Sequence, residues 1–151
     1  MIKEENQSSA GMYTPTDQRR FHMMAKPGGS TCNIDCQYCF YLDKGDLPNG
    51  PGSGRMSDEV LENFIRQYTE GITGNEIVFS WQGGEPTLLG LTYFKRIVEI
   101  EKKYSRPGLK IMNDLQTNGI LLNDAWCEFL KENNWLVGIS IDGPRELHDT
   151  Y

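Results

Sequence analysis

The sequence lacks any long hydrophobic run and is short of positive charge. None of its apolar stretches approaches the roughly 20 residues that cross a membrane, and its start shows no secretory signal pattern. Fifteen basic residues stand against 21 acidic ones, giving a net charge of −6. A general nucleic-acid binder would instead carry a basic patch. We therefore expect a protein with no membrane or nucleic-acid partner, in the cytoplasm by default.

Cysteine is also scarce, and its distribution is uneven. Three of the four cysteines, Cys32, Cys36 and Cys39, follow the spacing Cys-x3-Cys-x2-Cys, and Cys127 lies far along the chain. An odd cluster without a secretion signal argues against a disulfide framework. Structural zinc is disfavoured because it takes four ligands. Cys127 falls on a predicted helix, where we expect a buried thiol.

Three thiolates this close can share one inorganic centre. Iron–sulfur clusters are held by cysteine thiolates, normally one for each iron. A four-iron, four-sulfur (4Fe-4S) cluster on three cysteines would leave one iron open, and that iron could bind a small molecule through an amine and a carboxylate. The triplet therefore predicts such a cluster, with a non-catalytic cysteine metal-binding module as the alternative.

Apolar periodicity predicts four strands alternating with three helices. The expected strands are residues 21–26, 76–81, 109–117 and 135–141, the third weakened by Asn113 and Asp114. The expected helices are one from a Ser57 cap to Gly71, one over 91–104, and one from an Asn123 cap to Asn133-Asn134. Residues 1–20 are polar and predict a flexible tail, and residues 43–54 predict a loop because they are rich in glycine and proline.

This alternation predicts an α/β fold of parallel strands with covering helices and right-handed crossovers. Chemically suggestive motifs follow each strand in turn: the cysteines, residues 83–86, Asn118-Gly119 and Asp142-Gly143. Parallel strands bring their carboxyl ends to one rim, which holds the ligand in barrels and open sheets. We therefore expect these motifs to be neighbours in space.

A few single side chains also carry expectations. Val60 belongs to the apolar stripe that should bury the first helix. Glu99, Glu101 and Glu128 are expected on solvated helix faces. His22 and His148 have no evident partner, and both are interpreted as structural.

Several segments together resemble one family. Cys32, Cys36 and Cys39, with Tyr38 before the third cysteine, resemble the cluster loop of radical S-adenosylmethionine (SAM) enzymes. The flanking segments resemble anaerobic sulfatase-maturating enzymes: Lys26–Cys32 (KPGGSTC), Cys39–Leu42 (CFYL), Trp81–Thr87 (WQGGEPT), Gln116–Gly119 (QTNG) and Ser140–Pro144 (SIDGP). The resemblance runs from about Phe21 to the end of the sequence.

The resemblance implies a fold, two cofactors and a set of contacts. The fold would be a partial (β/α) barrel of the radical SAM type, with residues 21–151 as the N-terminal portion of its core domain. The cofactors would be the 4Fe-4S cluster and SAM. The implied cofactor contacts are Gly83 and Gly84 to the methionine amino group, Glu85 as a neighbouring acid, Tyr38 to the adenine, and Ser140 and Asn118 as polar contacts. Tyr41 and Gln82 would line the substrate side.

The resemblance also implies a reaction. The reduced cluster would cleave SAM to methionine and a 5′-deoxyadenosyl radical, which would take a hydrogen atom from a cysteine or serine of an unfolded sulfatase, leading to formylglycine. A low-potential donor such as flavodoxin or ferredoxin would supply electrons. Another peptide-modifying radical SAM maturase is the alternative.

The family core has six strand–helix units followed by a cysteine-rich cluster region, whereas this sequence predicts four strands. We therefore expect the chain to be a fragment that is inactive or poorly soluble alone, with apolar surface exposed along its fourth strand. The later units and the cysteine-rich region would be absent, and no catalytic base is assignable within the chain.

Overall fold

The computed structural model of the chain describes residues 21–41 and 54–150. The predicted tail, residues 1–20, and most of the predicted loop, residues 42–53, lie outside this description. Within it, the strands form one parallel sheet in the order β1-β2-β3-β4. The strands are β1 (Met23–Ala25), β2 (Glu76–Trp81), β3 (Lys110–Thr117) and β4 (Leu136–Ile139). The predicted α/β fold is confirmed, and the sheet is open rather than closed into a barrel.

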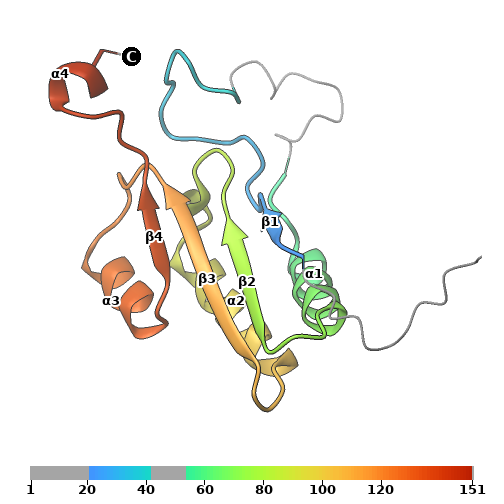
Figure 1. The fold of residues 1–151 in the computed structure, drawn as a ribbon. Coiled ribbons are helices and arrows are strands. Elements are labelled where there is room, and N and C mark those ends of the chain that lie inside the picture. Colours follow the sequence, from blue (N-terminus) through green and yellow to red (C-terminus); the bar gives the residue numbers. More distant parts are fainter. Residues whose placement is uncertain (1–20, 42–53, 151) are drawn as a thin grey trace, which may run out of the picture.

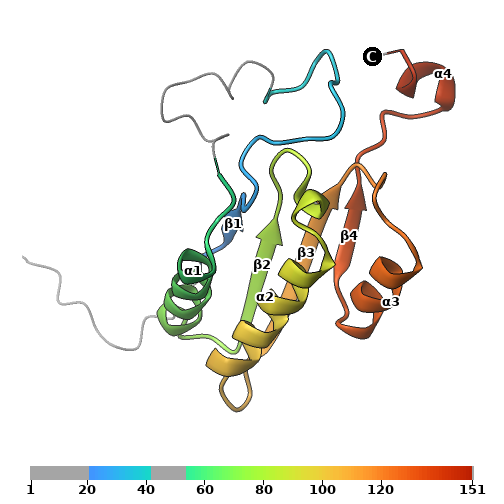
Figure 2. The same ribbon diagram turned by 180° about the vertical axis from the view of Figure 1, so that it is seen from behind.

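The three longer helices cover the same face of this sheet, as the two opposite views show (Figures 1 and 2). They are α1 (Asp58–Gly71), α2 (Leu91–Tyr104) and α3 (Asp124–Glu132). Both predicted caps are present, since Ser57 Oγ accepts from the Val60 N–H at 3.2 Å and Asn123 Oδ1 accepts from the Trp126 N–H at 3.1 Å. No helix in the described ranges is long and apolar enough to cross a membrane.

Two short helical segments lie near the carboxyl ends of the strands: η1 (Pro86–Leu89) and α4 (Arg145–His148). The sequence patterns did not predict either of them, because segments of four residues are too short to develop a helical period. Figure 1 shows α4 and the loop that follows β1 above the same end of the sheet. This end is therefore the part of the molecule where segments distant in sequence meet.

Aromatic side chains fill the space between the sheet and the helices. Phe79 and Trp81 of β2 are fully buried, and their rings stack with centroids 5.9 Å apart. Trp81 also stacks on Trp135, with centroids 6.5 Å apart, and Phe94 of α2 lies 5.5 Å from Trp135. Burying each such ring contributes about 2 kcal/mol. This layer fixes α1 and α2 against β2, and so positions the turn that follows β2.

The strand predictions were right in type and inexact in extent. The first and fourth strands are shorter than expected. β3 runs without interruption through Asn113 and Asp114, because both polar side chains have partners. Asn113 Oδ1 accepts from the Trp81 indole N–H at 2.7 Å, and an Asp114 oxygen accepts from the Ser80 hydroxyl at 2.5 Å. Tertiary hydrogen bonds here override the poor strand propensity of both residues.

The predicted burial of Val60 is wrong, since its side chain is 53% exposed. The buried stripe of α1 is instead formed by Leu61, Ile65 and Tyr68. Val60 precedes this stripe by one residue, so it lies on the flank of the helix rather than on its inner face.

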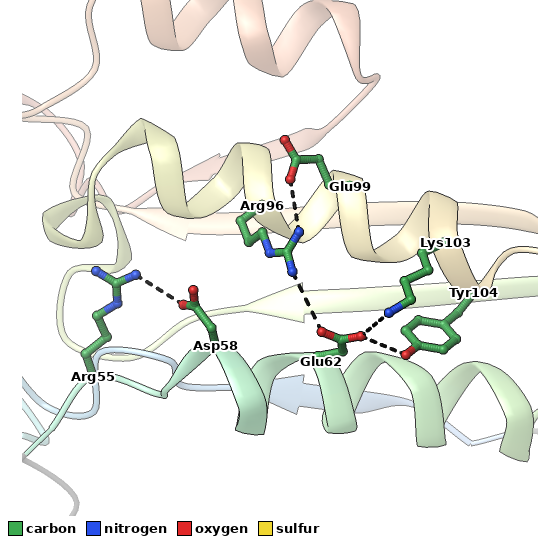
Figure 3. Close-up of polar contacts among 7 residues, drawn as sticks. All are labelled: Arg55, Asp58, Glu62, Arg96, Glu99, Lys103 and Tyr104. Carbon is green, nitrogen blue, oxygen red and sulfur yellow. Dashed lines mark hydrogen bonds and ion pairs between the residues drawn. The ribbon is translucent and has the colours of Figure 1, made fainter.

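A surface network joins α1 to α2 (Figure 3). Glu62 of α1 accepts hydrogen bonds from Lys103 and from the Tyr104 hydroxyl and forms an ion pair with Arg96 at 3.7 Å. The hydrogen bond from Lys103, followed by that from Tyr104, lowers the pKa of Glu62. Because the side chains of Arg96 and Lys103 are exposed, the network sets the register of the two helices more than it contributes to stability.

Glu101 contradicts the expectation of a solvated helix face, because it is only 5% exposed. The residue lies on the inner side of α2, where its Oε2 accepts from the Asn113 amide at 3.0 Å. Asn113 in turn accepts from Trp81, so a buried polar chain runs from α2 to β2. Glu99 and Glu128 are exposed, as expected.

We predict that Glu101 makes stability depend on pH. Burial raises the pKa of Glu101 from 4.5 to about 8, against a smaller lowering by the Asn113 hydrogen bond. The folded protein therefore keeps a proton that the unfolded chain releases, so this stabilisation is full below about pH 4.5 and is lost as the pH rises through about 8. The loss should be on the order of a few kcal/mol.

Urea unfolding at acidic, neutral and alkaline pH measures this effect in the parent protein and in Glu101→Gln. The amide cannot ionise, so the variant should lose less stability as the pH rises. Glu128→Gln, at an exposed position of α3, is the matched control and should follow the parent. Parallel pH profiles for the parent and Glu101→Gln would contradict the prediction.

Candidate functional site

A cavity of about 400 Å³ opens at the carboxyl ends of the strands. The cysteine loop supplies one side of it, and the ends of β2, β3 and β4 supply the other. Its lining includes Cys32, Cys36, Tyr38, Cys39, Tyr41, Gln82, Gly83, Gly84, Gln116, Thr117, Asn118 and Ser140. The prediction that these motifs are neighbours in space is confirmed. Glu85 is the one predicted site residue that does not line the cavity.

The diglycine turn after β2 makes a close crossing with the start of the cysteine loop. The Gly84 N–H donates to the Gly29 carbonyl at 2.9 Å, and the Glu85 N–H donates to the Thr31 carbonyl at 2.8 Å. A Cβ on Gly84 would lie 2.2 Å from the Thr31 carbonyl oxygen. Gly83 has a φ of +131°, which L residues rarely adopt. The glycines are therefore required first by the protein's own backbone, before any ligand is considered.

We predict that Gly84→Ala displaces the cysteine loop. The added methyl group overlaps backbone carbonyls of Ser30 and Thr31, which cannot move without shifting the loop. The variant should lose iron uptake and unfold at a lower temperature than the parent. Iron per chain after anaerobic reconstitution, together with thermal unfolding, measures both effects. Gly74→Ala is the control, because its Cβ would meet nothing closer than 3.9 Å; normal iron uptake by Gly84→Ala would contradict the prediction.

Glu85 is buried, with 2% of its surface exposed, and its carboxylate has four donors. Oε1 accepts from the Thr87 N–H at 2.9 Å, from the Thr87 hydroxyl at 2.5 Å and from the Thr117 hydroxyl at 2.8 Å. Oε2 accepts from the Asn118 N–H at 2.8 Å. The side chain therefore ties the start of η1 to the end of β3. Both oxygens accept hydrogen bonds from residues at the carboxyl rim of the sheet. The geometry therefore supports a positioning role for Glu85 rather than a direct cofactor contact.

Asn118 extends this connection to the cysteine loop. Its Oδ1 accepts from the Ile120 N–H at 3.0 Å, which fixes the orientation of the amide. Its Nδ2 donates to Asn33 Oδ1 at 2.8 Å and lies 3.8 Å from Cys32 Sγ. Hydrogen bonds thus run from Glu85 through Asn118 to the first cysteine of the triplet.

We predict that Glu85→Gln destabilises the protein by about 1–3 kcal/mol. The amide nitrogen would face a backbone N–H or hydroxyl groups that donate in the parent, leaving a buried donor without an acceptor. The measurement is the free energy of unfolding in urea. Glu59→Gln, on the exposed first turn of α1, is the control and should change it little. Equal stability of Glu85→Gln and the parent would count against this role.

The three thiols of the triplet are partly exposed and face a shared cavity. The Cys39 N–H donates to the Cys36 carbonyl at 2.9 Å, which closes a turn between two of them. The Tyr41 N–H lies 3.4 Å from Cys39 Sγ, and the Asn118 amide approaches Cys32 Sγ. N–H groups that point to sulfur are one of the features that tune iron–sulfur clusters. The donor set therefore suits such a cluster.

The three thiols could in principle bind either a single zinc ion or an iron–sulfur cluster. Ligands of one zinc ion at about 2.3 Å would bring the sulfur atoms to about 3.8 Å from each other. In the described ranges, no three His, Cys, Asp or Glu side chains converge closely enough to hold a single metal ion. A cluster offers several irons at separate corners, so its thiolates surround a larger body. Three thiols that line one cavity can each supply a ligand to a separate iron of such a cluster.

Cys127 is exposed on α3, so the prediction of a buried thiol is wrong. The inner face of α3 is taken by Trp126, Phe129 and Leu130. Cys127 follows Trp126 directly and therefore points away from the sheet. It does not line the cavity.

The remaining predicted site residues have defined neighbours. Ser140 Oγ accepts from Gln116 Nε2 at 2.9 Å, which joins the ends of β3 and β4. The ammonium of Lys26 lies 5.0 Å from the centre of the Tyr41 ring. The Tyr38 hydroxyl donates to Asp142. Sequence reasoning noted Asp142 only as the residue that follows the fourth strand, because nothing in the pattern pairs it with a tyrosine 104 positions away.

His22 is not isolated, contrary to expectation. Its Nε2 lies 2.7 Å from Ser80 Oγ, and Ser80 Oγ lies 2.5 Å from Asp114 Oδ2. Because an ionised carboxylate only accepts, the Ser80 hydroxyl donates to Asp114 and accepts from the histidine. This order differs from that of hydrolases, in which the histidine lies between the acid and the serine. The trio therefore does not activate Ser80 as a nucleophile.

Together these features define a class of protein. It is an open parallel α/β sheet, covered by helices on one face, with a cofactor cavity formed by three cysteines and a diglycine turn at its carboxyl rim. The chain belongs to the Radical SAM superfamily, whose sequence profile matches residues 27–151. The predicted cofactors, a 4Fe-4S cluster and SAM, are those of this superfamily.

Among curated proteins, the chain is similar to anaerobic sulfatase-maturating enzymes. The chain is 50% identical over 142 residues to a serine-type anaerobic sulfatase-maturating enzyme of Bacteroides thetaiotaomicron, covering 94% of this chain and 34% of that protein. It is 45% identical over 127 residues to a cysteine-type anaerobic sulfatase-maturating enzyme of Clostridium perfringens, covering 84% and 34%. The chain thus spans about a third of the length of these relatives.

A solved structure described as native anSMEcpe with bound AdoMet and Cp18Cys peptide has a similar fold. Its TM-score is 0.75 at 42% sequence identity, covering 85% of this chain and 33% of that one. A second structure, native anSMEcpe with bound AdoMet alone, gives a TM-score of 0.73 at 43% identity, covering 83% of this chain and 33% of that one. The predicted partial barrel of the radical SAM type is confirmed.

Proposed function

We propose that this protein takes part in anaerobic sulfatase maturation, oxidising a cysteine or serine of an unfolded sulfatase to formylglycine. The observation that carries the proposal is the single cavity lined by the cysteine triplet, the diglycine turn and the ends of β3 and β4. The names of the relatives support it, since one serine-type sulfatase-maturating enzyme is 50% identical and one cysteine-type enzyme is 45% identical. Residues 21–151 act in this proposal as the N-terminal portion of a radical SAM core domain.

The chain's residues divide between cofactor and substrate. Cys32, Cys36 and Cys39 hold the 4Fe-4S cluster, which supplies, when bound and reduced, the electron that cleaves SAM to methionine and a 5′-deoxyadenosyl radical. Tyr38, Gly83, Gly84, Asn118 and Ser140 would contact SAM, and Tyr41 and Gln82 would face the peptide. Their common place around one cavity supports this division. Glu85 acts indirectly, by holding Asn118.

The remaining partners follow from the chemistry. Loss of a hydrogen atom from the β-carbon of serine leaves a radical that becomes the aldehyde by giving up one further electron and one proton. From cysteine the same loss gives a thioaldehyde, which water hydrolyses to the aldehyde with release of hydrogen sulfide. The overall reaction also needs a low-potential electron donor to reduce the cluster, for which flavodoxin or ferredoxin is suitable, and an acceptor for the electron that the substrate radical gives up. The acidic balance of the chain supports the absence of a nucleic-acid partner, and the reducing cytoplasm suits partly exposed thiolates.

The proposal predicts that the cysteine triplet, and not the fourth cysteine, is needed for chemistry. The protein expressed from its native reading frame is reconstituted anaerobically with iron and sulfide, reduced, and given SAM with peptides carrying either cysteine or serine. We expect absorbance near about 400 nm, release of 5′-deoxyadenosine, and an aldehyde in the peptide. Replacing Cys32, Cys36 and Cys39 together by alanine should abolish all three.

Cys127→Ala is the matched control, because this thiol is exposed and outside the cavity, and it should retain all three signals. Protein that takes up zinc but no iron would overturn the proposal and support a non-catalytic metal-binding module. Release of 5′-deoxyadenosine with a peptide modification other than an aldehyde would point to a different peptide-modifying maturase.

A further inference from the structure

The two halves of the cysteine loop are held by different contacts. The first half meets the diglycine turn through Gly29 and Thr31 and meets Asn118 through Asn33. The second half contains Cys36 and Cys39, and it spans the cavity toward β4. There, the Tyr38 hydroxyl donates a hydrogen bond to Asp142 Oδ2. This contact joins the loop to the strand at the opposite end of the sheet from β1.

The hydrogen bond between Tyr38 and Asp142 affects the turn that carries two of the cysteines. Tyr38 lies inside the turn that the Cys39 N–H closes onto the Cys36 carbonyl. Fixing its side chain therefore fixes the orientation of the turn that presents two thiols.

Backbone contacts fix the position of Asp142 just beyond the end of β4. The Ser140 N–H donates to the Thr117 carbonyl at 2.9 Å, which continues the register of β4 beyond its last residue. Asp142 N lies 3.4 Å from His148 Nδ1 on α4. Gly143 follows with a φ of +112°, which turns the chain into that helix. The Asp142 carboxylate itself lies 3.6 Å from His148 Nδ1, beyond the end of β4 and outside the cavity lining.

We propose that Asp142 is a positioning residue of the radical site, which acts through Tyr38 to hold the Cys36–Cys39 turn across the cavity. The inference rests on the proposed function and adds a residue to it. Asp142 fixes Tyr38, which lines the cavity on the side of the cysteine loop, from a position outside the lining. Gly84 and Glu85 fix the side of the cavity at the end of β2. The two sides together set the space between the cluster thiols and the strand ends.

Because Asp142 and Tyr38 are both exposed, a positioning role can be distinguished from a role in the stability of the fold. The Asp142 side chain is 49% exposed and Tyr38 is 59% exposed, so the hydrogen bond between them adds little to global stability. Its loss should leave the unfolding temperature nearly unchanged while loosening the turn. A structural role would move the unfolding temperature instead.

The test uses Tyr38→Phe, Asp142→Ala, Asp142→Asn and the double variant Tyr38→Phe/Asp142→Ala, in protein expressed from its native reading frame and reconstituted as above. We expect Tyr38→Phe and Asp142→Ala each to raise the KM for SAM roughly fivefold to tenfold, with iron content and unfolding temperature close to those of the parent. The double variant should be no worse than either single variant, because both remove the same contact. Asp142→Asn should restore most of the loss, since its amide oxygen still accepts from the phenol.

Asp149→Ala is the matched control. Asp149 is an exposed acid at the C-cap of α4 that pairs with Arg145 at 2.9 Å, so its loss should not change the KM. A parent-like KM in Asp142→Ala, or additive losses in the double variant, would overturn the inference while leaving the proposed function intact. Parent protein that takes up no iron would overturn the proposed function, and this inference with it.

Discussion

The close crossing of two backbones, at Gly84 and at Ser30–Thr31, is the constraint on which the site depends. Hydrogen bonds at 2.9 Å and 2.8 Å join these segments, and a single methyl group on Gly84 would not fit between them. The crossing sets where the cysteine loop begins relative to the end of β2. It therefore fixes where the first half of the loop, which leads to Cys32, lies relative to the strand ends.

A second layer of contacts transmits this placement along the rim. Glu85 connects η1 to Asn118, and Asn118 connects to the loop next to Cys32. Beneath the rim, Trp81 holds β2 against the helices and bonds to Asn113. The carboxyl rim of the sheet is therefore held both by the core beneath it and by hydrogen bonds along its edge. The cysteine loop, with its partly exposed thiols, packs on this ordered rim.

Much of this could be predicted from the sequence, and the limits have physical causes. The strand–helix alternation, both helix caps and the gathering of the motifs at one rim follow from local patterns, because periodicity and capping are local properties. Burial of Glu101 could not be predicted, since its partner Asn113 comes from a strand whose polar residues had weakened the prediction. The positioning role of Glu85 and the pairing of Tyr38 with Asp142 depend on tertiary neighbours far away in sequence. Cys127 was assigned to the wrong face of a correctly predicted helix.

The short strand β1 affects how the cysteine loop that follows it becomes ordered. With only the three residues Met23–Ala25 in the ladder, the segment leaves the sheet well before the first thiol, and the loop gains no order from strand pairing. Its order comes from rim contacts and from whatever its sulfur atoms bind. Ligation and local folding are then thermodynamically linked, so binding of the inorganic centre also stabilises the ordered form of this loop.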